Sequence, residues 1–395
     1  MSGEHIVVLG AGTGGLVAAN LLAHKGYRVT LVERSDTHLF QPGMLWIAFR
    51  GHNPSRYLRP VEELVDPSVN LVRGTVEAVN LHDRTVKLVD GRTLEYDRLI
   101  VALGVSLDWE AIEGLPEARE KYGDFYSGAG QAERLWESFS RMREGTLLVA
   151  VSDPLYKCPP APHKAAFLAS LTVREKGLQG KVRVALAVPY PHAYPATSFS
   201  PLVEEKLEEA GVEVYTFFTL DRIDVEAGKA YSLEGEEVEF NVAAVIPPNR
   251  GPAITIEPGE AVDEDGFIKV DKETLEISGY DDAYAIGDCN NAPTSKSGVT
   301  AHLEAEVVVD RIEGWDARFN GRTNCPVVTD GEASFVITDY AHQAVPVRFT
   351  RFKRLLEELF IEAYWSSLRY PWRWKPVFHA YFQATMPGTL GGRGW

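Results

Sequence analysis

The sequence predicts an α/β protein with two Rossmann-like dinucleotide-binding domains and a C-terminal amphipathic segment at a membrane interface. Three observations predict this fold class. A glycine turn separates a buried strand from a helix near residue 10, a second series of strands and helices occupies residues 146–247, and an aromatic and basic stretch covers residues 349–388. Strands that alternate with helices in this way are typical of parallel sheets covered by helices.

Length and composition set the first limits on function. The chain has 395 residues, of which 45% are hydrophobic, so it can form two packed domains. Its net charge of −16 argues against a nucleic-acid partner. Residues 1–5 lead into a strand without a basic region or cleavage site, which predicts cytoplasmic synthesis. No uncharged apolar run approaches the ~20 residues that span a bilayer.

The glycine turn carries the strongest motif. A strand over Ile6–Leu9 runs into GAGTGG and then into a helix, and the next strand ends at Glu33. The glycines of the GxGxxG motif are Gly10, Gly12 and Gly15. They permit a tight turn and a close approach of a pyrophosphate to the helix N-terminus, while Glu33 can accept hydrogen bonds from ribose hydroxyls. This setting predicts a bound dinucleotide.

Two later segments extend this site. A buried strand ends at Ala102-Leu103-Gly104, and YAIGDC delivers Gly287 and Asp288 just before another helix. That helix N-terminus and Lys296 would stabilise negative charge on a reduced ring. The predicted cofactor-binding residues are Gly10, Gly12, Gly15, Glu33, Arg34, Gln41, Pro42, Val76, Ala102, Gly104, Gly287, Asp288 and Lys296.

The second α/β region lacks a nucleotide cradle. Its first strand, TLLVAV, is followed by SDPLYKCPPAPHK where a glycine turn would stand. Without that turn, a second dinucleotide has no phosphate site. We therefore expect residues 146–247 to keep the Rossmann frame without its usual ligand.

These motifs resemble a known family. GAGTGG, the Ala102-Leu103-Gly104 strand end and YAIGDC resemble the two-dinucleotide-fold flavoproteins over essentially the whole chain. FQPGM, Lys157-Cys158-Pro159 and NCPVVT, at residues 324–329, resemble the sulfide:quinone oxidoreductase branch. The resemblance implies non-covalently bound FAD, sulfide as the electron donor and a membrane quinone as the acceptor.

The resemblance also implies the roles of two cysteines. It places Cys158 and Cys325 beside the flavin as a redox-active disulfide, and it assigns the flavin contact to Cys158 and the persulfide to Cys325. Hydrosulfide could attack this disulfide and leave a persulfide and a thiolate. One subgroup of the family carries a third cysteine where this chain has Ser127, so the two-cysteine subgroup is the better match.

The surroundings of the cysteines suggest further expectations. Three cysteines do not predict a structural disulfide framework. Lys157, His163 and Lys164 lie near Cys158, which predicts a lowered thiol pKa. Cys289 has no basic residue among its near neighbours, which favours a packing role. His163 and His192 are candidate proton carriers, with a structural role as the alternative.

The C-terminal stretch is unlike the rest of the chain. Trp365, Trp372, Trp374 and Trp395 fall within the last 31 residues, and residues 348–375 carry seven Lys or Arg against three Asp or Glu. Apolar residues recur at helical spacing at Phe352, Leu355, Leu356, Leu359 and Phe360. This pattern predicts a helix lying on a membrane surface, with packing on the flavin domain as the alternative.

These expectations combine into one domain plan. Residues 1–110 and 260–322 would form a discontinuous FAD-binding domain, residues 111–259 the second Rossmann-like domain, and residues 323–395 the quinone and membrane-interface region. The expected quinone site contains Phe335, Tyr340 and Lys296. We expect no metal site, and self-association is open.

Three rival functions remain. A type II NADH dehydrogenase shares the frame but needs the missing glycine turn. A flavocytochrome c sulfide dehydrogenase flavin subunit has a motif similar to CPPAP, but it attaches FAD through a cysteine in the region of residues 36–45, where this chain has none. A non-catalytic flavin-binding membrane partner would use its cysteines only for packing.

Overall fold

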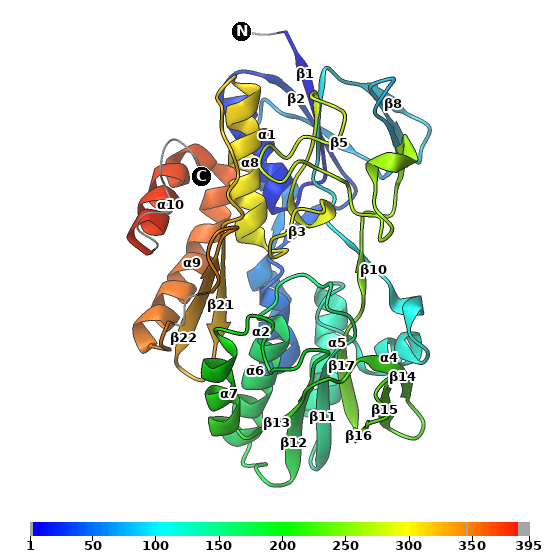
Figure 1. Ribbon diagram of the computed structural model, residues 1–395, viewed down its shortest axis with the longest axis vertical. Coiled ribbons are helices and arrows are strands. Elements are labelled where there is room, and N and C mark those ends of the chain that lie inside the picture. The colour runs from blue at the N-terminus through cyan, green and yellow to red at the C-terminus, as the bar shows by residue number, and fades with distance from the viewer. Residues whose placement is uncertain (1–2, 345–346, 386–395) are drawn as a thin grey trace.

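Two parallel sheets build two lobes of an elongated molecule in the computed structural model, which describes residues 3–344 and 347–385 (Figure 1). The sheet of the first lobe has the strand order β20-β9-β1-β2-β5, and all of its pairs are parallel. Its strands are β1 (His5–Leu9), β2 (Arg28–Glu33), β5 (Asn70–Arg73), β9 (Arg98–Val101) and β20 (Ala283–Ala285).

The middle of this sheet is buried on both faces. Ile6–Leu9 of β1 are fully buried, as expected for a central strand of a parallel sheet. Helices α1 (Thr13–His24) and α8 (Gly298–Ile312) pack against each other beside it. Because β2 lies on one side of β1 and β9 on the other, the strand order reverses direction at β1. Open α/β sheets bind ligands at such a point, beside the carboxyl ends of the strands.

Smaller sheets surround the first lobe. One has the order β19-β6-β7-β8, and another pairs β3 with β4. Their strands are β3 (Thr37–Leu39), β4 (Leu58–Pro60), β6 (Val76–Asn80), β7 (Thr85–Leu88), β8 (Thr93–Glu95) and β19 (Thr255–Glu257). The two lobes are joined by the antiparallel pair of β10 (Ser106–Leu107) and β18 (Asn249–Arg250).

The second lobe repeats the parallel frame. Its main sheet has the order β13-β12-β11-β17, and a three-stranded sheet β14-β15-β16 lies at its side. Helix α2 (Gly43–Arg50) reaches across from the first lobe and packs on α5 and α6. The strands are β11 (Gly145–Val151), β12 (Val182–Ala187), β13 (Val212–Tyr215), β14 (Leu220–Asp224), β15 (Lys229–Ser232), β16 (Glu237–Glu239) and β17 (Val242–Ile246). The helices are α4 (Leu115–Tyr122), α5 (Ala129–Ser140), α6 (Ala161–Glu175) and α7 (Ser200–Glu209), and the short α3 (Val61–Leu64) belongs to the first lobe.

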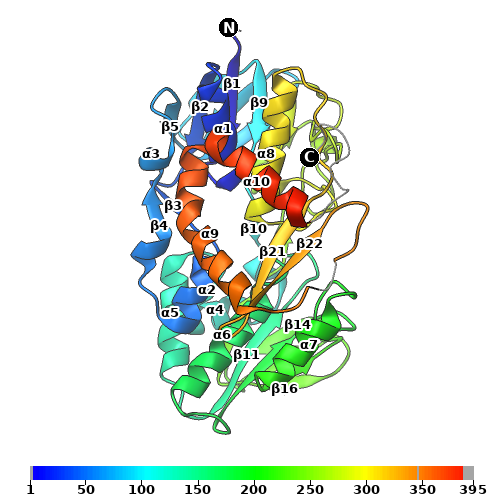
Figure 2. The same cartoon turned by 90° about the vertical axis from the view of Figure 1, so that its left-hand side faces the viewer.

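The C-terminal region spans both lobes. It consists of the hairpin β21 (Thr323–Val328) and β22 (Ala333–Thr338), followed by α9 (Arg351–Arg369) and α10 (Pro371–Thr385). Figure 2 shows α9 running diagonally from the first lobe, beside α1, to the second lobe, while α10 crosses α8. Within the described residues, no helix combines the length and the apolar character needed to cross a membrane.

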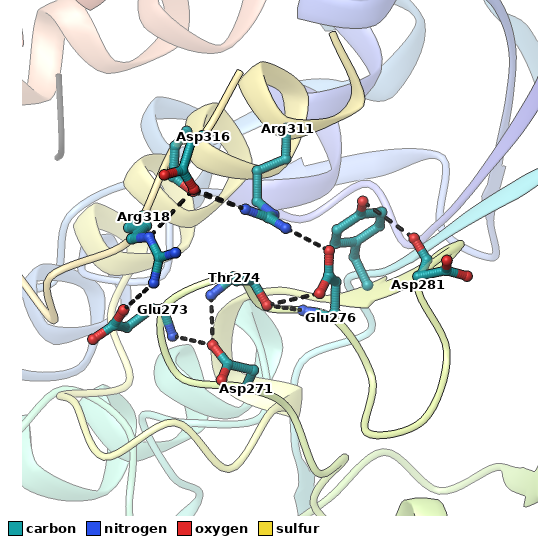
Figure 3. A network of polar contacts seen from close by, with 10 residues as sticks. Asp271, Glu273, Thr274, Glu276, Asp281, Arg311, Asp316 and Arg318 are labelled. Carbon is teal, nitrogen blue, oxygen red and sulfur yellow. Dashed lines mark hydrogen bonds and ion pairs between the residues drawn. The ribbon is translucent and has the colours of Figure 1, made fainter. Parts of the chain in front are cut away.

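A polar network anchors the far end of α8 (Figure 3). Arg311 donates to Glu276 at 2.6 Å, and Arg318 donates to Glu273 at 2.9 Å. The Asp271 carboxylate accepts from the backbone of Glu273 at 2.9 Å. These contacts tie α8 to the loop that precedes β20, and β20 leads directly to Gly287 and Asp288. Ion pairs that solvent reaches contribute little energy individually, so we assign these contacts a positioning role.

Candidate active site

In the turn between β1 and α1, two glycines have no space for a side chain and a third has free space in front of it. A Cβ on Gly15 would lie 1.8 Å from the Gly10 carbonyl oxygen, and a Cβ on Gly10 would lie 2.6 Å from the Ala102 carbonyl oxygen. A Cβ on Gly12 would meet only the Ala102 oxygen, at 3.9 Å. The backbone thus requires Gly10 and Gly15, whereas Gly12 leaves space in front of the turn.

Glu33, at the end of β2, holds this turn from the side. Its carboxylate accepts from the Ala11 N–H at 2.6 Å and from the Ser35 N–H at 2.7 Å. Each oxygen keeps lone-pair capacity for a second donor. Glu33 therefore lies where the sequence placed it, with backbone contacts that the motif alone did not predict.

The residues around the turn fit FAD. The N-terminus of α1 has no side-chain cap, so its N–H groups are available to a phosphate. Gly104 has φ +70° and nothing within 4 Å of where its Cβ would be. The Asp288 carboxylate has no hydrogen-bond partner within residues 3–344 and 347–385, and burial raises its pKa against the opposing charges of Lys157 and Lys296. Uncapped N–H groups, open glycines and an unpartnered carboxylate are what a dinucleotide would satisfy.

The other predicted cofactor residues lie in varied positions. Arg34 and Gln41 are exposed, and Gln41 Oε1 accepts from Lys157 Nζ at 3.4 Å, a contact between the two lobes. Pro42 precedes α2, and Val76 is buried at the start of β6. The Ala102 carbonyl packs against Gly10.

The two predicted redox cysteines approach one segment from different elements. The Cys158 N–H donates to the Lys296 carbonyl oxygen at 2.7 Å, and Cys158 has φ +58°, in the left-handed region. Cys325 on β21 is buried, and its sulfur lies 3.7 Å from the Ser295 hydroxyl and 3.6 Å from the Thr323 hydroxyl. We call Ser295, Lys296 and Ser297 the 295–297 segment. Both thiols are free in this structure.

The prediction of a lowered thiol pKa at Cys158 is wrong for this structure. Burial, together with the neighbouring Cys325 sulfur, raises the pKa of Cys158 to about 12. Lys164 and Lys157 act in the opposite direction, but they do not outweigh the loss of water. The pKa of Cys325 is also raised by burial. In the reduced protein these cysteines are thiols at neutral pH.

Lys164 is engaged elsewhere. Its ammonium donates to Glu357 of α9 at 2.9 Å, and both side chains are buried. The Lys164 ammonium also lies 5.0 Å from the centre of the Trp46 ring, and the Arg354 guanidinium lies 4.9 Å from the same ring. Sequence reasoning placed Lys164 beside Cys158, but it could not show that a carboxylate 193 residues away shares its charge.

The two histidines have structural surroundings. His163 is fully buried between the carbonyls of Pro159 and Ala193, and burial lowers its pKa to about 4. His192 is half-buried and contacts the Thr197 hydroxyl at 3.1 Å. Neither contact reaches a cysteine. Cys289 is fully buried with its sulfur against the Val101 and Ile286 carbonyls, in agreement with a packing role.

Two of the three predicted quinone residues lie on or next to β22. Phe335 is half-buried opposite Pro326, and Tyr340 packs its ring over Gly321 and donates its hydroxyl to the Lys272 carbonyl at 2.8 Å. Lys296 lies in the 295–297 segment and donates to the Asn290 side chain at 3.2 Å. No hydrogen bond joins Tyr340 to Lys296 in the part of the chain that the structure describes.

Sequence reasoning missed a buried acid beneath this site. Glu304 of α8 is fully buried and accepts from the Gly287 N–H at 2.5 Å and from Asn290 at 3.0 Å. Burial raises its pKa to about 8, although Lys296 opposes the shift. A glutamate within the apolar run VTAHLEAEVVV is the sequence signal that could have identified it.

Comparison with known proteins agrees with this geometry. The family model described as pyridine nucleotide-disulphide oxidoreductase matches residues 4–146. The mitochondrial sulfide:quinone oxidoreductase of Mus musculus is 26% identical over 372 residues, which cover 90% of this chain and 82% of that protein. The Dictyostelium discoideum protein of the same name is 28% identical, over 82% of this chain and 75% of that protein.

A solved structure extends the likeness to the fold. The sulfide:quinone oxidoreductase of the hyperthermophilic bacterium Aquifex aeolicus has a TM-score of 0.80 at 18% identity, covering 93% of this chain and 91% of that chain. These matches confirm the predicted flavoprotein fold and FAD as the cofactor. The chain is an FAD-dependent oxidoreductase that matches the pyridine nucleotide-disulphide oxidoreductase family over residues 4–146 and is similar over most of its length to sulfide:quinone oxidoreductases.

Proposed function

We propose that this chain is a sulfide:quinone oxidoreductase that uses Cys158 and Cys325 as a redox pair. The observation that carries the proposal is that both cysteines contact the 295–297 segment, Cys158 at Lys296 and Cys325 at Ser295. Cys158 stands where a second nucleotide would need its glycine turn. The donor site is therefore suited to a small sulfur substrate and not to a dinucleotide.

The chemistry begins from a Cys158–Cys325 disulfide. Hydrosulfide attacks one sulfur, which becomes a persulfide, and the other cysteine leaves as a thiolate. A second hydrosulfide then takes the outer sulfur of the persulfide as hydrodisulfide, so the pair is left as a dithiol that holds the two electrons and returns to the disulfide when it gives them up. Bound FAD would accept these two electrons and pass them to a quinone. By resemblance, Cys325 carries the persulfide and Cys158 faces the flavin.

The surroundings of the pair favour short-lived thiolates. Burial raises the pKa of both thiols and so disfavours a permanent thiolate. The negative charge that forms on sulfur during the attack therefore lasts only until the electrons leave. The hydroxyls of Ser295 and Thr323 can donate to Cys325 as that charge develops. Lys157 and Lys164 lower the energy of the charge on Cys158 without making it permanent.

Attachment to a membrane surface is the second part of the proposal. Phe352, Leu355 and Leu359 are each at least 50% exposed on one side of α9, whereas Ile361, Tyr364 and Leu368 are buried against the protein. The helix thus packs on the protein with one side and offers apolar side chains on the other, which suits insertion into a lipid headgroup region. Quinone would enter near the β21–β22 hairpin, beside Phe335.

Liposome flotation tests the membrane part. We expect the variant Phe352→Ser/Leu359→Ser to float at least about tenfold less well than the wild type, because two exposed apolar side chains are lost. The matched control changes exposed Leu233 of the second lobe to Ser and should float normally. Equal flotation of all three proteins would remove α9 from the proposal.

An anaerobic titration tests the activity itself. Sulfide should bleach the oxidised flavin spectrum, and decylubiquinone should restore it. NADH should leave the spectrum unchanged, because the turn after β11 has prolines in place of the glycines that cradle a nucleotide. Bleaching by NADH and not by sulfide would instead support a type II NADH dehydrogenase, and no bleaching by either would support a flavin-binding module.

A further inference from the structure

Helix α9 reaches the FAD-binding turn through a buried tyrosine. The Tyr364 hydroxyl lies 2.8 Å from the Thr13 hydroxyl and 2.8 Å from His38 Nε2. His38 Nδ1 in turn lies 2.8 Å from the Ala11 carbonyl oxygen. Ala11 and Thr13 flank Gly12, the glycine with open space before it. A residue more than 350 positions away in sequence is therefore bonded to the turn that receives the cofactor's phosphates.

Hydrogen-bonding capacity fixes the direction of this chain of contacts. The Ala11 carbonyl can only accept, so His38 Nδ1 carries the proton. Burial lowers the pKa of His38, so the ring is neutral and its Nε2 accepts. The Tyr364 hydroxyl therefore donates to His38, and the Thr13 hydroxyl donates to Tyr364. One relay runs from Thr13 through Tyr364 and His38 to Ala11 and closes around Gly12.

The helix that carries Tyr364 is fixed on both sides of it. Asn20 of α1 donates to the Leu368 carbonyl at 2.7 Å, one turn after Tyr364. Two turns before it, Glu357 accepts from Lys164 of α6 at 2.9 Å. Tyr364 is itself buried, packed 4.6 Å from the ring of Phe40 and 5.2 Å from that of Trp365. Its hydroxyl is thus held at a defined position over the N-terminus of α1.

We propose that Tyr364 is a positioning residue for FAD, which holds the glycine turn in its phosphate-binding shape through Thr13 and His38. The C-terminal helix then belongs to the cofactor site as well as to the exposed apolar face. The Tyr364 ring packs against the rings of Phe40 and Trp365, and this packing does not require the hydroxyl. The hydroxyl alone makes the hydrogen bonds that reach the turn. This inference depends on FAD binding and not on the substrate that reduces the flavin.

The test is the release of FAD from the holoprotein without sulfide or quinone, followed by the rise in flavin fluorescence after dilution. Tyr364→Phe removes one buried hydroxyl and leaves Thr13 and His38 without their shared partner, so FAD should bind about three- to tenfold more weakly and dissociate correspondingly faster. Tyr370→Phe is the matched control, because that hydroxyl makes no hydrogen bond to any residue described in the structure. It should release FAD as the wild type does.

A pH profile separates the relay from simple packing. The groups that face His38 are Glu33, the Ala11 carbonyl, Tyr364 and the edge of the Trp365 ring. Protonation of His38 turns Nε2 into a donor and breaks the relay, so wild-type release should accelerate as the pH falls through a His38 pKa below its usual range. The variant His38→Asn keeps an N–H donor for the Ala11 carbonyl and leaves Glu33 unchanged, but it has no imidazole to protonate. Its FAD release should therefore not accelerate as the pH falls through this range.

Three results decide the question. The inference holds if Tyr364→Phe accelerates release, Tyr370→Phe does not, and the acid step disappears in His38→Asn. Release from Tyr364→Phe at the wild-type rate overturns it, as does an acid step that persists unchanged in His38→Asn. If Tyr364→Phe does not fold, the His38→Asn profile gives the same decision. A protein that failed the sulfide titration but passed this test would disprove the proposed activity and not the role of Tyr364.

Discussion

The turn between β1 and α1 and the turn between β11 and α6 occupy the same place in two similar lobes. Each follows the central region of a parallel sheet and opens a helix at its carboxyl edge. Neither helix N-terminus has a side-chain cap, but the first turn has glycines, whereas the second has prolines at positions 159, 160 and 162 around one cysteine. The same frame therefore supports a phosphate site in one lobe and a thiol site in the other.

The difference shows that the turn, and not the sheet, selects the ligand. Gly12 leaves open space, so a phosphate can approach the backbone. In the second turn Cys158 takes a left-handed conformation that costs a residue with a side chain about 1 kcal/mol. Its N–H is bonded to Lys296 of the other lobe and is therefore not available to a phosphate. The second turn presents a sulfur atom at a fixed position.

The largest expected effect is the loss of a sulfur atom from the second turn. Cys158→Ala or Cys325→Ala should lower the rate of sulfide-dependent flavin reduction by about a thousandfold, because the disulfide that receives hydrosulfide cannot form. Stopped-flow spectroscopy measures this rate. Cys289→Ala removes the third thiol, which is buried away from the pair, and should stay within about twofold of the wild type. A wild-type rate in either variant of the pair would contradict the proposed chemistry.

The next effect distinguishes the two kinds of glycine in the first turn. Gly12→Ala places a methyl group where only the cofactor would meet it, so the protein should fold normally but bind FAD about ten- to a hundredfold more weakly. Gly15→Ala collides with the Gly10 carbonyl and should lower the melting temperature as well. Isothermal titration of the apoproteins with FAD, beside thermal unfolding, measures both quantities. Equal melting temperatures for the two variants would contradict this assignment.

The sequence predicted the repeated frame because local pattern determines it. The apolar strand before GAGTGG and the missing glycines after TLLVAV both mark the turns directly, and the two cysteines followed from their short motifs. The raised pKa of Cys158 could not be predicted in this way. Lys157 and Lys164 are visible next to it in sequence, whereas the burial that outweighs them depends on packing of the two lobes.

The role of α9 shows the same limit. Its apolar spacing predicted an amphipathic helix, and Phe352, Leu355 and Leu359 are indeed exposed. The same spacing could not show which residues the other side of the helix would contact. Glu357 meets Lys164, and Tyr364 meets Thr13, across separations of 193 and 351 residues. Such pairs follow from tertiary structure alone.

The way in which each lobe binds α9 gives a third prediction. The first lobe binds α9 through the neutral side chains of Asn20 and Thr13 and through ion pairs that solvent reaches, Asp66–Arg369 and Arg56–Glu362. The second lobe uses the buried Lys164–Glu357 ion pair. Lys164→Met leaves Glu357 with only Arg354, at 2.5 Å, and should lower the free energy of unfolding by about 2 kcal/mol. Chemical denaturation measures this loss. The double variant Lys164→Met/Glu357→Leu should recover most of it, and no recovery would show that the charge pair is not the cause.

The smallest expected effect concerns Glu304, the buried acid that accepts a hydrogen bond from the Gly287 N–H. The pKa of Glu304 is raised by burial from its usual value to about 8, so between these values the folded protein keeps a proton that the unfolded chain has lost. Stability therefore falls as the pH rises through this window. Glu304→Gln keeps an acceptor for the Gly287 N–H and has no charge to bury, so it should match the wild type near pH 5 and become the more stable protein by pH 8.5. Melting temperatures at the two pH values measure this crossover. If the difference between the variants did not change with pH, Glu304 would be ionised in the folded protein, and the first lobe would hold a buried charge as the second one does at Lys164.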